Sequence, residues 1–389
     1  MQITATREQA LDRLQDFVGV SGKYGRDRNH VVPGHSNVSC LSAAIRHRLV
    51  TEWEVAAAPL QKYAPSTVEK FTQEVYWRSY WKGWLSLRPQ VWDDYLAGIE
   101  EHPEAEAIRM GEGPVAVMND FARELRETGY LHNHARMWFA GYWIHIARLP
   151  WELGAKFFQD HLLDFDPASN TLSWRWVAGW QTPGKTYLPR RGNLEKYLHP
   201  ELLKTDGLEQ LEKPEAVRPD HPEKPPMTRP DLPDDKIPEA GGVLWLHGED
   251  LHPESSPLAD YQPSRVVVTG RMAGRSELQK KWLEKALTDV AQRAGGHFGV
   301  EVERAESLAD WADRASGRSA GPVVGMHPEV GPLHDELKNL EATGLDLALL
   351  VRPEDRALRE LATGGFFGFW KKLQKRMKAG EFPLRHPLS

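Results

Sequence analysis

The chain has 389 residues, enough for two or three domains with a sizeable core. Its net charge of -6 excludes a protein that binds nucleic acid through overall basic charge, so any DNA contact must come from a local patch. The single cysteine, Cys40, excludes a disulfide framework and a zinc site made of cysteines. There is no signal-peptide pattern and no run of about 18 apolar residues, so we expect a soluble, cytoplasmic protein without membrane contact.

Residues 1–207 are predicted to form a helical domain. Apolar residues recur at helical spacing over residues 9–18, 68–87, 115–126 and 136–147, without the alternation that is typical of strands. Eleven of the fifteen tryptophans lie before residue 181. Most of them are expected to be packing residues, although a core does not need so many indole rings.

The segment from residue 128 to 180 combines apolar, tryptophan-rich sequence with a few isolated polar residues. These are Asn133, Arg136, Asp164, Asp166 and Asn170. Such groups are costly inside an apolar segment unless they have partners, and a large, flat cofactor rich in heteroatoms would supply them. The alternative is a metal site at the two aspartates, but nothing nearby offers further oxygen ligands at a known spacing.

This segment resembles the flavin-binding helical domain of the photolyase/cryptochrome family. The family carries TGW-x-HN-x-x-RM, a tryptophan, DxD, an asparagine and WxW in this order. The chain has the corresponding elements without a gap: Thr128-Gly129-Tyr130, His132-Asn133, Arg136-Met137, Trp151, Asp164, Asp166, Asn170, Trp174 and Trp176. The resemblance implies that the protein binds FAD.

An upstream segment resembles the loop that binds the flavin phosphates in this family. Hydroxyl side chains and free backbone N–H groups at a helix start can bind an anion, and an arginine adds charge-assisted bonds. The alternative is an ordinary helix N-cap. The residues expected here are Tyr24, Arg28, Ser39, Cys40, Leu41 and Ser42, with Cys40 where the family often has arginine.

Glu74, Trp77 and Arg78 fall at positions i, i+3 and i+4 of a predicted helix and therefore share one face. In the family this glutamate contacts the damaged base pair and this tryptophan packs against it. A carboxylate beside a flavin can also donate a proton. The alternative is an ordinary Glu–Arg pair beside a core tryptophan.

The resemblance also assigns roles in the central segment. Asn133 and Met137 match residues of the lesion pocket, and Asn170 matches the residue opposite the flavin N5. Arg136 matches an arginine that contacts the isoalloxazine; because Ile146 replaces its usual aspartate partner, we expect it to pair with Asp164 or the flavin. The segment Asp164-Phe165-Asp166 is expected to face the flavin ring and ribityl chain.

Trp174 and Trp151 match the proximal and middle tryptophans of the family's electron-transfer chain, and Trp92 is a candidate for the distal member. As catalytic residues we therefore expect Glu74, Asn133, Trp151 and Trp174. Contacts with DNA or the lesion are expected from Trp77, Met137, His134, Trp176, Arg190 and Arg191, although residues 185–191 could equally be a solvated loop.

Residues 208–240 are rich in proline and charge and are predicted to form an extended linker. Residues 241–389 contain short apolar runs separated by helical stretches, which predicts a doubly wound, Rossmann-like α/β domain. The start of this domain resembles the α/β domain of photolyases, which comes first in the family. The resemblance thus implies a photolyase-like architecture with permuted domain order. His247-Gly248-Glu249 replaces an arginine pair of the family, so the second antenna chromophore stays unknown.

The function implied by the resemblance is FAD-dependent, light-driven repair of cyclobutane pyrimidine dimers in UV-damaged DNA, single- or double-stranded. Excited reduced FAD would pass an electron to a flipped-out dimer and regain it after the ring splits. The alternatives are a cryptochrome-like blue-light photoreceptor without repair activity and a flavoprotein that has lost its photochemistry. Protein partners stay unknown. Because every cofactor motif lies before residue 181, the helical domain is expected to bind FAD alone.

Overall fold

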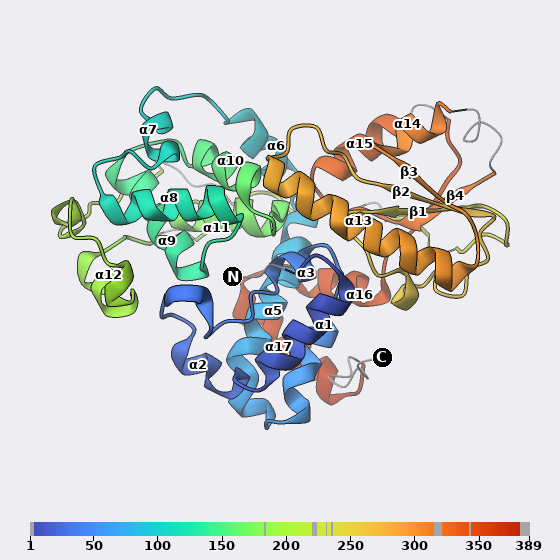
Figure 1. The fold of residues 1–389 in the computed structure, drawn as a ribbon, viewed down its shortest axis with the longest axis horizontal. Coiled ribbons are helices and arrows are strands. Elements are labelled where there is room, and N and C mark those ends of the chain that lie inside the picture. Colours follow the sequence, from blue (N-terminus) through green and yellow to red (C-terminus); the bar gives the residue numbers. More distant parts are fainter. Residues whose placement is uncertain are drawn as a thin grey trace.

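The computed structural model describes residues 4–182, 184–219, 224–230, 232–234, 236–314, 321–341 and 344–381. The first half of the chain is helical (Figure 1). Its helices are α1 (Arg7–Val18), α2 (Tyr24–Asp27), α3 (Ser42–Arg46), α4 (Glu52–Ala57), α5 (Pro65–Ser86), α6 (Gln90–Ala97), α7 (Ala105–Met110), α8 (Ala116–Thr128), α9 (Asn133–Gly141), α10 (Trp151–His161), α11 (Pro167–Val177) and α12 (Arg191–Tyr197).

Local signals place two of the motifs at helix starts. His132 precedes α9 and its ring accepts a hydrogen bond from the backbone N–H of His134 at 3.1 Å. Asp166 caps α11 by accepting from the N–H of Ser169 at 2.7 Å, with proline in the first turn. The turn that leads into α9 requires glycine at Gly129, because its φ is 68° and a Cβ atom would lie 2.5 Å from Leu163.

The second half contains one parallel sheet, as its Val- and Leu-rich runs predict. Its strands are β1 (Val243–His247), β2 (Arg265–Thr269), β3 (Val302–Ala305), β4 (Val323–Met326) and β5 (Leu347–Leu350), in the order β3-β2-β1-β4-β5. The crossover helices are α13 (Glu277–Phe298), α14 (Leu308–Ala312) and α15 (Pro332–Glu341). The chain winds outward from β1 in both directions, so the switch point lies between β1 and β4.

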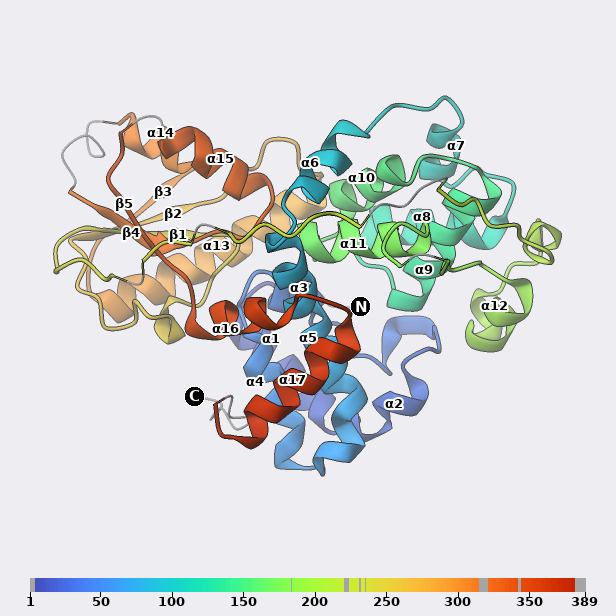
Figure 2. The same cartoon turned by 180° about the vertical axis from the view of Figure 1, so that it is seen from behind.

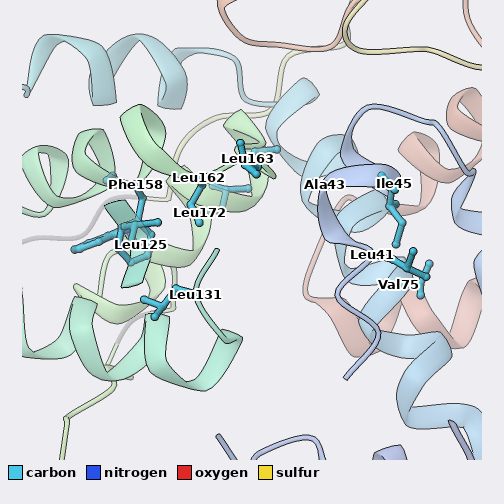
Figure 3. Packing of buried hydrophobic residues seen from close by; sticks show 14 of the residues in the cluster. Leu41, Ala43, Ile45, Val75, Leu125, Leu131, Phe158, Leu162, Leu163 and Leu172 are labelled. Atoms are coloured by element: carbon cyan, nitrogen blue, oxygen red, sulfur yellow. The ribbon is translucent and has the colours of Figure 1, made fainter. Parts of the chain in front are cut away.

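The two faces of the sheet belong to different cores. Val243 and Trp245 pack in a small core with Trp311 of α14 and Leu337 of α15. Leu244 and the other side of the sheet belong to the large core, which also contains α13 and the helices of the first half. Figure 3 shows part of this core, with Leu125, Leu131 and Phe158 in one group and Leu41, Ile45 and Val75 in another.

The last two helices return to the first half of the chain. Helices α16 (Pro353–Leu361) and α17 (Phe366–Lys378) lie beside α5 in both views (Figures 1 and 2). The approach is close, because a Cβ atom on Gly83 of α5 would lie 2.9 Å from the Cβ of Ala362. The hydroxyl of Tyr80 donates to the carbonyl of Gly364 at 2.8 Å. The core around α5 is therefore completed by the C-terminal residues.

Between the halves, Leu208–Leu211 form a short 3-10 helix with both leucines buried, at the start of the segment predicted as an extended linker. The described residues between 213 and 239 carry neither helix nor strand. Among the residues that the structure describes, none of the helices combines the length and apolar character that crossing a membrane requires.

Candidate cofactor site

The site is built around the two aspartates that precede α11. Arg136 of α9 donates to both carboxylate oxygens of Asp164, at 3.0 and 2.9 Å, which confirms one of the two partners expected for this arginine. The side chain of Ser42, at the start of α3, contributes to lowering the pKa of Asp164. Burial raises the pKa of Asp164, but the charge and hydrogen bonds of Arg136, together with the charge of Arg78, outweigh it and the pKa ends below its usual value.

Asp166 is almost completely buried between two guanidinium groups. Its Oδ2 lies 3.5 Å from Nη1 of Arg78 and 3.6 Å from Nε of Arg46. Burial alone would raise the pKa of Asp166, but Arg78 and Arg46 outweigh that effect and lower it to about 2. Both aspartates are thus ionised and face arginines, an arrangement that leaves little room for a metal ion between them.

The predicted phosphate loop is held from both sides. Arg13 of α1 donates from Nε to the carbonyl of Ser39 at 2.8 Å, and Arg78 donates from Nη2 to the carbonyl of Ser42 at 3.4 Å. Buried Cys40 has a φ of 54°, a left-handed conformation that few residues other than glycine adopt. Leu41 is fully buried and makes no side-chain cap, so the first N–H groups of α3 have no capping side chain.

A second cluster brings Glu74 of α5 together with Tyr24 of α2 and with Arg28, which follows α2. Arg28 and Glu74 form an ion pair in which each side chain keeps more than a quarter of its surface exposed. Tyr24 packs edge-on against Phe71 of the same helix α5. Burial raises the pKa of Glu74 above its usual value, although the charge of Arg28 opposes this shift. Trp77 and Arg78, on the same face of α5, are also partly exposed.

The predicted electron-transfer tryptophans lie in three helices: Trp92 in α6, Trp151 in α10 and Trp174 in α11. Trp174 is 2% exposed and its ring meets that of Phe158 edge-on at 5.0 Å. Trp151 packs against Tyr95 at 5.8 Å, and Tyr95 against Trp92 at 5.2 Å. The candidate distal residue Trp92 is thus linked to the middle tryptophan through a tyrosine.

Asn133 and Met137 lie on α9, where Asn133 is exposed and Met137 partly exposed. Asn170 is buried in α11, and its amide nitrogen donates to the carbonyl of Ala155 at 2.9 Å. Phe165 contributes its carbonyl, which accepts from Arg46 at 2.7 Å. The partly buried Trp176 packs against Tyr187 at 6.0 Å.

Two residues expected at the DNA surface have other partners. His134 is only 8% exposed, bonds to the carbonyl of Asn29 at 2.7 Å and stacks on Trp138 at 4.2 Å. A side chain enclosed in this way is not available to DNA, which corrects the expected contact. Arg191 is held by Glu195 and Glu212 at 2.8 and 2.9 Å, so its charge is already matched. Arg190 is exposed.

Sequence reasoning missed Arg46, which touches both the carbonyl of Phe165 and the carboxylate of Asp166. A signal was present. The run Arg46-His47-Arg48 follows an apolar stretch, and buried charges in such a position require partners. The partner of Arg46 could not be found in this way, because it is Glu249, about 200 residues further along the chain.

The sequence of this region is similar to that of known proteins. The family described as the FAD-binding domain of DNA photolyase matches residues 71–197. A deoxyribodipyrimidine photo-lyase of Agrobacterium fabrum is 29% identical over 180 residues, covering 44% of this chain and 37% of that protein. In this region the chain is similar to the FAD-binding domain of the photolyase/cryptochrome family.

Two further comparisons have narrower or looser matches. A cryptochrome DASH of Idiomarina loihiensis is 34% identical over 86 residues, covering 22% of this chain and 19% of that protein. The crystal structure of a class III photolyase from Agrobacterium tumefaciens is 26% identical, covers 49% of this chain and 42% of that chain, and gives a TM-score of 0.43. The match thus spans less than two fifths of these curated relatives, so their names do not assign an activity to this chain.

The residues present fit FAD. A pyrophosphate needs cationic side chains and free N–H groups, and the cationic side chains are Arg78 of α5, Arg136 of α9 and Arg28, which follows α2. Nη1 of Arg78 is buried without a hydrogen-bond partner, and the start of α3 has no capping side chain. This atom makes the 3.5 Å ion pair with Asp166, but a buried donor without a hydrogen bond is a reason to expect a ligand group beside it.

Proposed function

We propose that this protein is an FAD-dependent photolyase that splits cyclobutane pyrimidine dimers in UV-damaged DNA, with the two domains of the family in permuted order. The proposed units are a helical FAD-binding domain over residues 1–207, a linker over 208–240 and an α/β domain over 241–389. The helices of the matched FAD-binding region precede the parallel sheet in this chain, which supports the permuted order.

One observation carries the proposal. The paired carboxylates Asp164 and Asp166 are each bound by an arginine, and one of these, Arg78, lies on the same face of α5 as Glu74 and Trp77. A cofactor site and two groups suited to a flipped-out base thus share one helix face. Base-acting enzymes of this kind combine stacking surfaces with hydrogen-bonding groups in one pocket.

The residues of this chain would bind FAD and the pyrimidine dimer and orient them. FAD, when bound, supplies the light absorption and the electron that drive the reaction. Arg28 and Arg78 would neutralise the phosphates, while the bond from Asn170 to Ala155 fixes the plane of the amide. Asn133 would donate a hydrogen bond from α9 to a dimer carbonyl where negative charge develops, and Glu74, which pairs with Arg28 in this structure, would do the same in its protonated form.

A second candidate is a blue-light photoreceptor without repair activity. Two observations favour it: the His134 side chain is buried, and Arg191 is paired with two glutamates. The net charge of -6 also gives no general attraction to DNA.

A repair assay separates the two candidates. Reduced protein is illuminated in the presence of single- or double-stranded DNA that carries cyclobutane dimers. The number of repaired dimers is then compared with that in a dark control. The proposal predicts light-dependent repair of at least one DNA form. Normal photoreduction without any repair would reject the photolyase and leave the photoreceptor.

Variants then test the roles of the two polar residues. Glu74→Ala and Asn133→Ala should keep the flavin spectrum and lower the repair yield by about tenfold or more, as loss of a donor aimed at developing charge does. Glu127→Ala, on the exposed side of α8, is the control and should repair at the wild-type rate. Equal repair by all three variants would remove both residues from the mechanism.

A further inference from the structure

The α/β domain has a crevice at its switch point. Open parallel sheets bind ligands at the carboxyl ends of the two strands where the winding reverses, here β1 and β4. The two strand ends are joined by a hydrogen bond of 2.9 Å between Nε2 of His247 and the carbonyl of Met326. The walls of the crevice come from the segments that follow β1, β4 and β5.

This crevice is filled from the helical half of the chain. Arg48, which follows α3, donates to Asp250 at 3.1 Å and to both oxygens of Asp355 at 2.6 Å. Lys82 of α5 also lines it. The remaining cavity is about 10 Å³, at the lower limit for one water molecule, whereas a cofactor site needs roughly 300 Å³ or more. The usual ligand position is therefore occupied by protein.

The position of Arg48 in the crevice is fixed by its backbone conformation and its contacts. Its φ is 51°, an unusual conformation for arginine, and it is 5% exposed. Arg352 approaches Asp250 from the other side, at 2.7 and 2.8 Å, and both guanidinium groups lie over the ring of Trp53 at 5.9 and 5.7 Å. Breaking a buried pair of this kind leaves an uncompensated charge, so the two halves are held in one fixed arrangement.

A second set of contacts connects the loop after β1 with the cofactor site. Oε1 of Glu249 accepts from Nη2 of Arg46 at 2.9 Å, and Oε2 accepts from the backbone N–H of Glu329 at 3.1 Å. Arg46 in turn donates from Nε to the carbonyl of Phe165 at 2.7 Å and lies 3.6 Å from Asp166. The loop after β1 thus reaches the aspartate segment through Arg46, and beside it the ring of His47 contacts the carbonyls of both Gly248 and Leu163.

We propose that the α/β domain of this protein is a clamp on the flavin domain instead of a carrier of a second pigment at its switch point, and that Glu249 is a positioning residue. It acts through Arg46 on residues 164–166. The inference rests on the proposed FAD site. Glu249 holds Arg46 so that it does not form a hydrogen bond with Asp166, and the Asp166 carboxylate faces both Arg46 and Arg78.

The test measures FAD affinity and the energetic coupling between Glu249 and Arg46. FAD affinity is measured by fluorescence titration of apoprotein for wild type, Glu249→Gln, Arg46→Gln and the double variant. Glu284→Gln is the matched control, since Glu284 is in an exposed ion pair with Arg304 on the same domain. Urea unfolding of each apoprotein comes first, and Glu249→Asp, which keeps the charge, replaces Glu249→Gln if the latter does not fold.

We expect Glu249→Gln to weaken FAD binding about tenfold, which corresponds to loss of one charge-assisted interaction, and the control to bind as wild type does. Because Glu249 acts through Arg46, the double variant should bind no more weakly than Arg46→Gln. The shape of the bound flavin absorbance band should change in Glu249→Gln as well. Effects that multiply in the double variant, or unchanged binding in Glu249→Gln, would overturn the positioning role.

The stoichiometry tests the filled crevice. Titration of the wild type with excess FAD should saturate at one FAD per chain, and a second FAD would overturn the clamp. Failure of the wild type to bind any FAD would instead reject the proposed function itself, so the two failures are distinguishable.

Discussion

The substitution Gly154→Ala tests the packing behind the aspartates. Gly154 lies in the middle of α10, where alanine would ordinarily stabilise a helix by about 1 kcal/mol. Here an added Cβ would lie 2.4 Å from Cη2 and 2.5 Å from Cζ3 of Trp174, and 2.9 Å from Nε1 of Trp143. Real Cβ atoms do not approach ring atoms this closely, so the ring or the helix must shift.

Neither indole can move easily. Trp174 is 2% exposed and Trp143 is completely buried, with its Nε1 bonded to the carbonyl of Pro150 at 2.8 Å. Overpacking a well-filled core costs about 1–3 kcal/mol, which exceeds the gain in helix propensity. We therefore expect Gly154→Ala to lower the free energy of unfolding by up to about 2 kcal/mol.

The assay is urea unfolding followed by far-UV circular dichroism. The control is the same substitution at Gly296 near the end of α13, where an added Cβ has no heavy atom within 4 Å. That variant should gain about 0.5 kcal/mol. If Gly154→Ala stabilises the protein as much as Gly296→Ala does, the described packing of Trp174 on α10 is wrong.

Three further outcomes are expected. Trp174→Phe should slow photoreduction of the bound oxidised flavin, followed by absorbance, whereas Trp245→Phe in the small core should not; equal rates would place the electron path elsewhere. Deleting residues 241–389 should give a chain that does not fold or hold FAD, seen by circular dichroism, because Arg48 would lose its partners. Lowering the pH from about 4 to 2 should lower the free energy of unfolding by about 2 kcal/mol through Asp166 alone. The pKa of Asp166 is lower in the folded than in the unfolded protein, so its charged form stabilises the fold, and this stabilisation is lost as the carboxylate is protonated. A free energy of unfolding that stays constant over this pH range would contradict the prediction.

Local sequence patterns predicted much of the fold. The Val- and Leu-rich runs indicated parallel strands, and the described part of the chain contains five such strands. The pairing of Arg136 with Asp164 was foreseeable because Ile146 cannot serve as its partner. In each case the decisive information lies within a short segment or in the chemistry of a single position.

Contacts between distant segments escaped prediction. His134 is buried because Asn29 and Asn193, about 105 residues before it and 59 after it, supply its partners. The helical half was expected to bind FAD alone, but Gly83 of α5 packs against residues near 360. Periodicity shows that a helix has an apolar face; it does not show which later segment covers that face.

The central claim is that the arginines around residues 164–166 form one FAD site. FAD content after reconstitution and gel filtration tests it most directly, in the wild type, Arg136→Ala, and the control Arg191→Ala, whose arginine pairs with surface glutamates. The account predicts one FAD per chain in the wild type and control, and strong loss in Arg136→Ala. A wild type that takes up no FAD, or an Arg136→Ala protein that retains it fully, would contradict the account.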